Sequence, residues 1–412
     1  MDNERGTVAV VGGGPAGLMA ATVLCEAGLR VELFDAMPSV GRKLLVAGRG
    51  GFNLTNSVPP ATFADQYGAH RPFFEKILAR FSADDLRAWL QGMGIETRVG
   101  TSGRVFPVEA TAADLLRTWL ARLRVKGVTI RTGHRWLELT GERELLFRCA
   151  DGSEQRLAAA GIVLALGGAS WPKTGSDGRW TGILARHGIA IVPFQPSNCG
   201  FEAAWSETFA SRFAGAPLKN LTLTTASGRK NVGELVITRH GLEGGGIYPL
   251  TPALREELAA HGQATLFLDL KRDLTAAGVE ARLKRPRGKN SLANFLRKTL
   301  RLPPAAYSLL RECCPPSDFN DPSLLAARIK KLPVPLTAIR PIEEAISSAG
   351  GIAMTEIDDQ CMLIKLPGIF VAGEMLDWEA PTGGFLLQGA FSTGYSAAHG
   401  LLAWLDQSPP GR

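Results

Sequence analysis

The chain has 412 residues, of which 45% are hydrophobic and 21% are charged. This composition is typical of a soluble globular protein, and the length predicts two domains. A net charge of +7 is too small to indicate nucleic acid binding unless the charge is concentrated in one patch. The six cysteines show neither a CxxC motif nor metal-ligand spacing, which argues against a zinc site. Because there is no signal peptide and no apolar run of about 18 residues, we expect a cytoplasmic protein without a membrane span.

The first predicted elements form a strand–helix–strand unit. Residues 7–11 are a short β-branched apolar run, which is typical of a buried parallel strand. Residues 15–27 follow as a helix with Pro15 in its first turn. A second strand covers residues 31–34 and ends at Asp35.

Three glycines of this unit have the GxGxxG spacing of a dinucleotide-binding turn. Gly12 permits the tight turn, Gly14 lets a pyrophosphate approach the backbone, and Gly17 lets the helix pack closely on the strand. The helix N-terminus offers unpaired N–H groups to the phosphates. Asp35 stands where a carboxylate accepts both ribose hydroxyls, which favours FAD or NAD over NADP.

Two later glycine-rich stretches favour FAD over NAD. In residues 161–175 a strand ends at Gly167 and Gly168. In residues 368–400 a strand is followed by a turn with Glu374 and Asp377, and then by a helix that begins near Gly384. A second helix N-terminus suits a long ligand such as FAD, whose flavin gains negative charge on reduction.

The middle of the chain has a different pattern. Residues 84–92 and 110–127 are predicted helices, and period-2 alternation after residue 191 indicates strands. Residues 276–331 are mostly helical, with the proline pairs at 303–304 and 315–316 between short helices.

On these motifs the chain resembles the bacterial FAD-dependent oxidoreductases described as BaiN/RdsA-like or aminoacetone-oxidase-like, within the glutathione-reductase-type flavoproteins. The matching stretches lie between Val8 and Gly394 and include VVGGGPAGLMAA, GRKLLVAGRGGFNLTNS, GRVFPVEATAADLL, LALGGASWPKTGSDG, SSAGGIAMTEID and GEMLDWEAPTGGFLLQGAFSTG. Residues 48–53 read GRGGFN where the larger branch has GGGRCN, and Phe385-Leu386 replaces its Tyr-Asn. The chain therefore resembles a side branch of that family.

The resemblance implies an α/β fold with two domains. A Rossmann-like FAD-binding domain, a parallel sheet with helices, is expected to comprise residues 1–191 and 342–412. A β-barrel-like domain is expected at residues 192–341, with a helical subdomain at about 276–331.

The motifs and the resemblance together give a set of candidate site residues. For FAD binding these are Gly12, Gly14, Pro15, Ala16, Gly17, Asp35, Ala36, Arg42, Lys43, Asn53, Trp136, Gly167, Gly168, Trp171, Gly373, Glu374, Asp377, Gly383, Gly384, Phe385, Leu386 and Leu387. For catalysis they are Arg49, Asn53 and Arg104, where the amide can bond the flavin and an arginine can hold an anionic substrate. No metal is expected.

The predicted function is an FAD-dependent oxidoreductase that acts on a small organic substrate by hydride transfer. One version takes hydride from NADH or NADPH and passes it to an enone-like double bond. The other is an amine or amino-acid oxidase that releases hydrogen peroxide. A second GxGxxG domain is missing from the sequence, so NAD(P)H either docks transiently at the flavin or is not the reductant.

Two further hypotheses stay open, and the sequence leaves the oligomeric state undecided. The basic stretch 282–301 suggests a tRNA-modifying flavoprotein, although a solvated helix face explains it more simply. A flavin-binding protein without turnover is the other hypothesis. His240 and the Cys313-Cys314 pair are further candidates for reactive groups, but the sequence favours a solvated loop histidine and an inert thiol pair.

Overall fold

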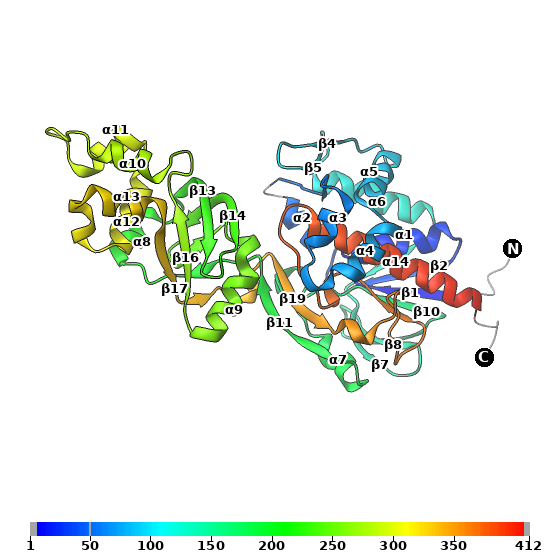
Figure 1. Ribbon diagram of the computed structural model, residues 1–412. Coiled ribbons are helices and arrows are strands. Elements are labelled where there is room, and N and C mark those ends of the chain that lie inside the picture. Colours follow the sequence, from blue (N-terminus) through cyan, green and yellow to red (C-terminus); the bar gives the residue numbers. More distant parts are fainter. Residues whose placement is uncertain (1–5, 49–50, 408–412) are drawn as a thin grey trace. The chain divides into compact units, whose positions relative to one another are not determined.

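The computed structural model describes residues 6–48 and 51–407. The chain forms two compact units: unit 1 comprises Met1–Gln195 and Ser347–Arg412, and unit 2 comprises Pro196–Ile346 (Figure 1). The chain thus leaves the first unit, builds the second, and returns. Within the described ranges, no helix is both long enough and apolar enough to cross a bilayer.

Unit 1 is built on a five-stranded sheet in which every neighbouring pair of strands is parallel. In spatial order the strands are β20 (Ile369–Val371), β10 (Gly161–Leu164), β1 (Thr7–Val11), β2 (Arg30–Asp35) and β6 (Thr129–Thr132). The apolar runs form buried strands because both faces of the sheet are covered. The fold class predicted for this part of the chain is confirmed.

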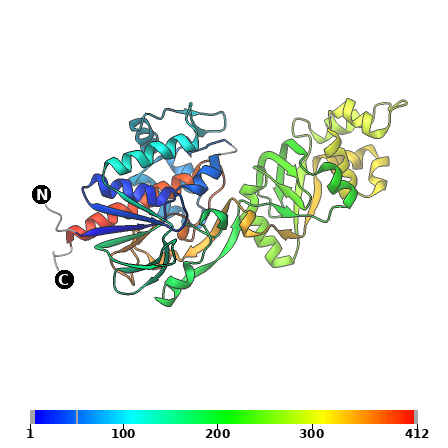
Figure 2. The same ribbon diagram turned by 180° about the vertical axis from the view of Figure 1, so that it is seen from behind.

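Alternate residues of the central strand contribute to different cores. Val8 and Val10 pack into a cluster with three helices, α1 (Pro15–Glu26), α6 (Ala112–Val125) and α14 (Phe385–Gln407). Ala9 and Val11 pack into a cluster with the antiparallel strands β7 (Arg135–Leu139), β8 (Glu144–Arg148) and β9 (Glu154–Ala158). Unit 1 therefore has three layers, with helices over one face of the parallel sheet and a small sheet over the other (Figures 1 and 2).

Local sequence sets the ends of the helices. α6 begins one residue after Thr111, which forms a capping box with Asp114, and it ends two residues before Gly127 at φ +85°. α5 (Ala83–Gly92) has a second capping box, between Ser82 and Asp85.

The remaining α-helices and strands of unit 1 are α2 (Arg42–Ala47), β3 (Thr55–Asn56), α3 (Pro60–Asp65), α4 (Arg71–Arg80), β4 (Thr97–Val99), β5 (Arg104–Pro107), α7 (Thr181–Arg186), β11 (Ile191–Ser197) and β19 (Ser347–Ile352).

Unit 2 contains a seven-stranded antiparallel sheet. Its spatial order is β17 (Leu332–Leu336), β16 (Ala264–Asp269), β13 (Pro217–Thr225), β14 (Lys230–Ile237), β15 (Gly241–Glu243), β12 (Phe201–Glu202) and β18 (Ala338–Ile339). The two edge strands, β17 and β18, are separated in the chain by Thr337 alone. Because one residue spans only about 3.5 Å, the two edges must lie close together and the sheet must curl. This is the barrel-like shape that the resemblance implied.

Helices surround this sheet and include the expected helical subdomain. α8 (Glu207–Phe213) and α9 (Thr251–His261) follow individual strands, whereas α10 (Ala276–Leu283), α11 (Leu292–Leu300), α12 (Pro304–Cys313) and α13 (Pro322–Lys330) are consecutive. Their buried faces, including Leu296 and Leu309, join the same hydrophobic cluster as the strands. The helical subdomain is therefore packed onto the sheet of unit 2.

The contact between α1 and α14 predicts that a side chain at Gly394 destabilises the fold. A Cβ atom at Gly394 would lie 2.2 Å from the carbonyl oxygen of Ala16, which is backbone that cannot move aside. We expect Gly394→Ala to reduce the free energy of unfolding by about 1–3 kcal/mol or more. Thermal unfolding followed by circular dichroism measures this. Gly182→Ala in α7 is the control, because nothing lies within 4 Å of its Cβ position. Equal unfolding midpoints for the two variants would contradict the expectation.

Candidate functional site

The glycine-rich turn after β1 has the geometry of a phosphate-binding turn. Gly12 has φ +108°, and a Cβ there would lie 2.2 Å from the carbonyl oxygen of Ala165. At Gly17 a Cβ would lie 1.9 Å from the carbonyl oxygen of Gly12, so the helix rests directly on the turn. Gly14, in contrast, has nothing within 4 Å of its Cβ position. The one open side of the turn is thus the side on which a ligand can approach.

The first turn of α1 has backbone donors to offer at this opening. Gly14 is the N-cap residue and no side chain caps the helix. Pro15 has no N–H, so the first donors without an intrahelical partner are those of Ala16 and Gly17. Together with the positive end of the helix dipole, they can bind a phosphate group.

Asp35, at the end of β2, is fixed by two backbone donors. Its Oδ2 accepts the N–H of Gly13 at 2.8 Å, and its Oδ1 accepts the N–H of Met37 at 2.8 Å. Burial raises the pKa of this carboxyl above its usual value, while these two bonds and the charge of Arg42 oppose the rise. Each oxygen keeps a further lone pair, so the carboxylate can still accept two hydroxyl groups.

Lys43 of α2 joins three segments that are far apart in the sequence. Its Nζ donates to Oε2 of Glu374 at 2.6 Å and to Oγ of Ser170 at 2.8 Å. Glu374 follows β20 and Ser170 follows β10, so the carboxyl ends of two parallel strands are held to α2. The turn after β1 is at the same edge of the sheet, which is where ligands of open α/β sheets bind.

A second part of the site brings residues 53–56 against the start of α14. A Cβ at Gly384 would lie 2.3 Å from the carbonyl carbon and oxygen of Thr55, and Nδ2 of Asn56 donates to the carbonyl oxygen of Gly383 at 2.9 Å. Arg104 pairs with Asn56 across β3 and β5, and its Nε is 3.8 Å from the Cβ position of Gly383. The structure therefore brings Arg104, residues 55–56 and the Gly383-Gly384 pair together, and Asn53 precedes Thr55 by two residues.

Buried polar atoms without partners test whether these residues fit a dinucleotide. Within the described residues, ten buried side-chain nitrogen or oxygen atoms have no hydrogen-bond partner. Four of them belong to the segments just described: Arg42 Nε, Asn53 Oδ1, Thr55 Oγ1 and Ser176 Oγ. Buried groups left unpaired cost about 1–3 kcal/mol each, so their concentration here fits a polar ligand that would pair with them.

The other predicted residues have varied surroundings. Trp136 is buried in the cluster of β7–β9, where its indole N–H donates to the carbonyl oxygen of Glu138. The ring of Phe385 packs edge-on against Phe63. Asp377 accepts the N–H of Gly350 at 3.2 Å. In the loop after β10 lie Gly167, Gly168 and Trp171, and Trp171 is exposed with φ +61°. Ala36 follows Asp35, Gly373 precedes Glu374, and Leu386 and Leu387 are half-buried in α14. Arg49 lies outside the described residues.

Three residues of the site were missed in the sequence. Ser170 accepts a hydrogen bond from Lys43, and Ser176 Oγ lies 3.0 Å from the Cβ position of Gly167. Both serines are in the motif LALGGASWPKTGSDG, which could have drawn attention to them. Tyr67 donates its hydroxyl to the carbonyl oxygen of Phe385 at 2.8 Å, and burial raises the pKa of this hydroxyl so that it stays protonated. Tyr67 had no sequence signal, because only the fold brings α14 to it.

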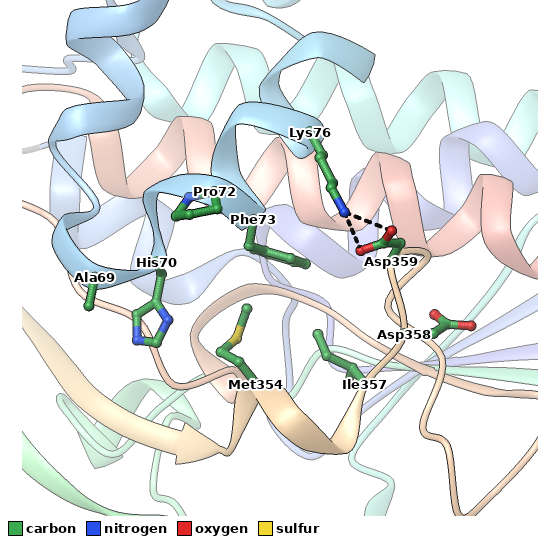
Figure 3. Close-up of a pocket in the computed structure, with 9 residues that line it drawn as sticks. All are labelled: Ala69, His70, Pro72, Phe73, Lys76, Met354, Ile357, Asp358 and Asp359. Atoms are coloured by element: carbon green, nitrogen blue, oxygen red, sulfur yellow. Dashed lines mark hydrogen bonds and ion pairs between the residues drawn. The ribbon is translucent and has the colours of Figure 1, made fainter.

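A small cavity in unit 1 lies apart from these segments. It has a volume of about 300 Å³ and lies between α4 and residues 354–359 (Figure 3). Lys76 forms an ion pair with Asp359 at its rim, at 2.7 Å, with side chains 55% and 68% exposed. A pair so exposed contributes little to stability. None of the glycine-rich segments lines this cavity, so we assign it no part in the site.

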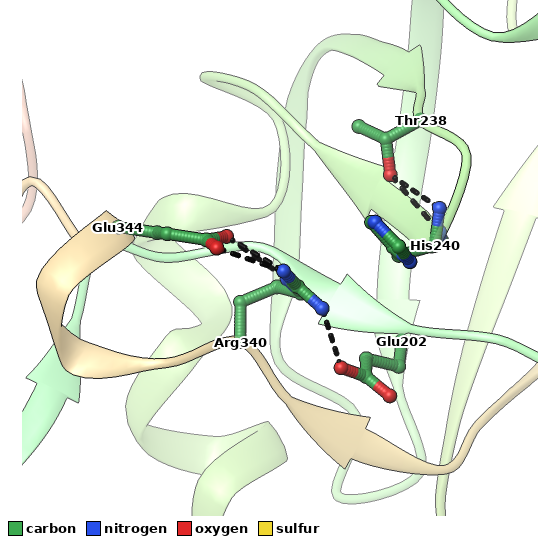
Figure 4. Close-up of polar contacts among 6 residues, drawn as sticks. Glu202, Thr238, His240, Arg340 and Glu344 are labelled. Atoms are coloured by element: carbon green, nitrogen blue, oxygen red, sulfur yellow. Dashed lines mark hydrogen bonds and ion pairs between the residues drawn. The ribbon is translucent and has the colours of Figure 1, made fainter.

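His240, Cys313 and Cys314 of unit 2 lie in surroundings that do not activate them. The backbone N–H of His240 donates to Oγ1 of Thr238 at 3.2 Å, and its imidazole is exposed. Arg340 pairs with Glu202 at 2.6 Å and with Glu344 at 2.8 Å (Figure 4). Cys313 and Cys314 are both free thiols. Burial raises the pKa of Cys313 to about 12 and also raises that of Cys314, which disfavours the reactive thiolate. Metal-binding groups of His, Cys, Asp and Glu are not found among the described residues.

Known proteins match this chain over nearly its whole length. A family model described as "HI0933-like protein Rossmann domain" matches residues 6–400. The chain is 24% identical over 406 residues to a 3-dehydro-bile acid delta(4,6)-reductase of Clostridium scindens, covering 95% of this chain and 97% of that protein. It is also 24% identical over 406 residues to a ribosomal RNA dihydrouridine synthase of Haemophilus influenzae, covering 94% and 96%.

Solved structures agree on the fold. A 3-ketosteroid-delta4-(5alpha)-dehydrogenase of Rhodococcus jostii matches with a TM-score of 0.52 at 16% identity, covering 97% of this chain and 96% of that one. A flavocytochrome c3 fumarate reductase matches with a TM-score of 0.52 at 16% identity, covering 97% and 78%. At this level of identity the similarity supports the shared architecture alone.

The bonds of Lys43 predict a loss of stability when the cation is removed. Lys43→Met leaves the half-buried carboxylate of Glu374 without its ion pair, so we expect the free energy of unfolding to fall by about 1–3 kcal/mol. Lys76→Met is the matched control, because its ion pair with Asp359 is exposed and is expected to contribute less than about 1 kcal/mol. Chemical denaturation of both variants measures the difference, and equal losses would refute the role given to Lys43.

Proposed function

We propose, because this chain belongs to the HI0933-like family of Rossmann proteins, that it is an FAD-dependent reductase of carbon–carbon double bonds conjugated with a carbonyl group. The family membership confirms the resemblance predicted from the motifs. The single observation that carries the proposal is the convergence of the turns after β1, β10 and β20, in which the Cβ position of Gly12 lies 2.2 Å from the carbonyl oxygen of Ala165 and that of Gly373 lies 3.0 Å from Cβ of Ala16. Two relatives support reduction rather than oxidation of the substrate, since a delta(4,6)-reductase and a dihydrouridine synthase are both named for a reduction.

The residues near Gly14 are proposed to hold the adenosine diphosphate half of FAD. The N–H groups of Ala16 and Gly17 would bind the pyrophosphate, with the open face of Gly14 admitting it. Asp35 would accept the two ribose hydroxyls, for which it has free lone pairs. Lys43 and Glu374 would fix the turns on which the middle of the ligand rests.

The residues near Gly384 are proposed to surround the flavin, which supplies the hydride chemistry when bound. Asn53 and Thr55 have unpaired buried oxygens to bond the ring edge. Arg104 is exposed beside Gly383, where its guanidinium would stabilise negative charge on the carbonyl oxygen of a substrate. NADH or NADPH is proposed as the transient electron donor.

Anaerobic spectroscopy of the purified protein tests this function. We expect bound flavin to lose its visible absorbance on addition of NADH or NADPH, and to regain it when an enone such as cyclohexenone or 4-androstene-3,17-dione is added. Failure to bind FAD would overturn the proposal. Bound flavin that is bleached by amines, and reoxidised by oxygen with peroxide release, would replace the reductase with the oxidase.

Within the same assay, Arg104→Gln tests the substrate-side cation. We expect enone-dependent reoxidation to slow by roughly 100-fold because charge on the carbonyl oxygen is no longer stabilised, with unchanged FAD affinity. Arg98→Gln is the control, since Arg98 lies on β4 of the same small sheet and faces Phe106. Equal rates for the two variants would remove Arg104 from the site.

Asp35 predicts how FAD affinity depends on pH. Only the ionised carboxylate accepts both hydroxyls, so FAD binding favours ionisation, and affinity should weaken as pH falls through the raised pKa of this group. Asp35→Asn should raise the Kd for FAD at neutral pH by roughly 10- to 100-fold and abolish this part of the pH dependence. Fluorescence titration of the apoprotein with FAD measures both.

The control for this titration is Glu32→Gln, on the same strand but ion-paired with Arg131 at 2.6 Å. Its FAD affinity should keep the pH dependence of the unmodified protein. A dependence that persists in Asp35→Asn would show that another group is responsible.

A further inference from the structure

The positive charge of this protein is concentrated in the helical subdomain of unit 2. Residues 276–331 contain twelve Lys and Arg against four Asp and Glu, a net charge of +8, whereas the whole chain carries +7. The rest of the chain is therefore close to neutral. This concentration is the localised patch that the overall charge did not reveal.

Most of these cations lack an acidic partner. Among the described residues, three of the twelve form ion pairs: Lys284 with Glu280, Arg328 with Asp318, and Lys330 with Asp269. In the loop before α11 and in α11 itself the cations are exposed, namely Lys284, Arg285, Arg287, Lys289, Arg297 and Lys298. Lys298 donates to Oδ1 of Asn290 at 2.9 Å, which holds the basic loop against α11. Of these six cations only Lys284 has an acidic partner, and like charges without counter-charges repel one another, so the surface is suited to a polyanion.

A cavity of about 590 Å³ within unit 2 adjoins this surface. It lies between α8, α11 and α12, and three arginines from the three helices line it: Arg212, Arg297 and Arg311. All three are exposed, and none forms an ion pair with a described residue. The cavity also contains one acidic residue, Glu312, whose carboxylate accepts the N–H and the hydroxyl of Ser206, another lining residue. The three arginines therefore outnumber the acidic groups of the lining by three to one.

The cavity also presents groups that suit a nucleotide. Tyr307 and Phe213 supply aromatic surface, and the guanidinium of Arg212 lies 5.5 Å from the ring centre of Phe213. Arginine forks bind phosphate oxygens bidentately, and bases stack on aromatic rings at a gain of about 1–3 kcal/mol per base. The combination of three unpaired arginines with an aromatic wall favours a phosphate with a base beside it.

We propose that the helical subdomain binds the phosphodiester backbone of a nucleic acid, with one phosphate held by Arg212, Arg297 and Arg311. A free nucleotide would fill the cavity alone and leave the exposed cations of residues 284–289 without a ligand. A chain of phosphates would occupy the cavity and also contact these cations. The solvated helix face favoured from the sequence did not include Arg212 and Arg311, which lie outside residues 282–301 and join them only in the fold. The proposal goes beyond the reductase function and does not depend on it.

Fluorescence anisotropy with the FAD-loaded full chain tests the proposal. The probes are a fluorescein-labelled single-stranded RNA of about 20 nucleotides and the DNA of the same sequence. We expect binding that weakens with salt, with a slope of log affinity against log salt near −0.7 for each phosphate neutralised. The double variant Arg297→Glu and Arg311→Glu should weaken binding at least tenfold and flatten the slope by about 1.4.

The matched control is the double variant Arg117→Glu and Arg124→Glu, which makes the same change in net charge on the exposed face of α6 in unit 1. It should bind as the unmodified protein does. Equal losses in both double variants would reduce the effect to net charge and overturn the proposal, as would no binding of either probe at low salt. ADP that displaces the probe, together with probe affinity that does not depend on the cations outside the cavity, would assign a mononucleotide site. That result would also overturn the proposal.

The two probes distinguish the source of the backbone. Tighter binding of the RNA assigns the site to RNA, and equal binding assigns it to the phosphodiester chain common to both; each supports the proposal. The flavin spectrum of every variant reports whether unit 1 is intact. Because Arg297 and Arg311 lie in unit 2, flavin bleaching by NADH or NADPH should be unchanged in their double variant, so failure of nucleic acid binding and failure of the reductase are separate results.

Discussion

The candidate site depends on close backbone contacts of residues 12–17. At three glycines these contacts leave no room for a Cβ atom. Gly17 rests on Gly12, Gly394 rests on Ala16, and Gly12 lies against Ala165. Each contact requires glycine, because a Cβ atom there would lie within 2.2 Å of a carbonyl oxygen. Three segments far apart in the sequence are thereby brought to one end of α1, where the only open side is at Gly14. Close packing of the backbone thus creates the turn at which we propose that a phosphate binds.

Local patterns in the sequence predicted the parts of the site that depend on local geometry. The GxGxxG turn, the helix after it and Asp35 lie within 30 residues, and strand periodicity and glycine spacing are enough to specify them. The bond between Lys43 and Glu374 spans 331 residues, and Tyr67 meets Phe385 across 318. Such pairs have no periodic signal, because they are decided by how helices and strands pack. For the same reason the basic stretch was visible in the sequence, whereas the addition of Arg212 and Arg311 to it was not.

The two units distribute charge differently. In unit 1, Lys43 of the candidate site is paired with Glu374, and Asp35 is held by the backbone N–H of Gly13. Such groups select a ligand by position. In unit 2 the cations of residues 276–331 are mostly unpaired, so they attract anions over a distance and respond to salt.

The unpaired polar atoms of the candidate site connect ligand binding to stability. Arg42 Nε, Asn53 Oδ1, Thr55 Oγ1 and Ser176 Oγ are buried without partners, at a cost of about 1–3 kcal/mol for each group. The raised pKa of Asp35 adds to that cost in the ligand-free chain, since its ionised form is poorly solvated. A ligand that pairs with these atoms recovers part of this free energy, and it does so only in the folded state. The same groups that make the site selective should therefore make the folded chain depend on its ligand for stability.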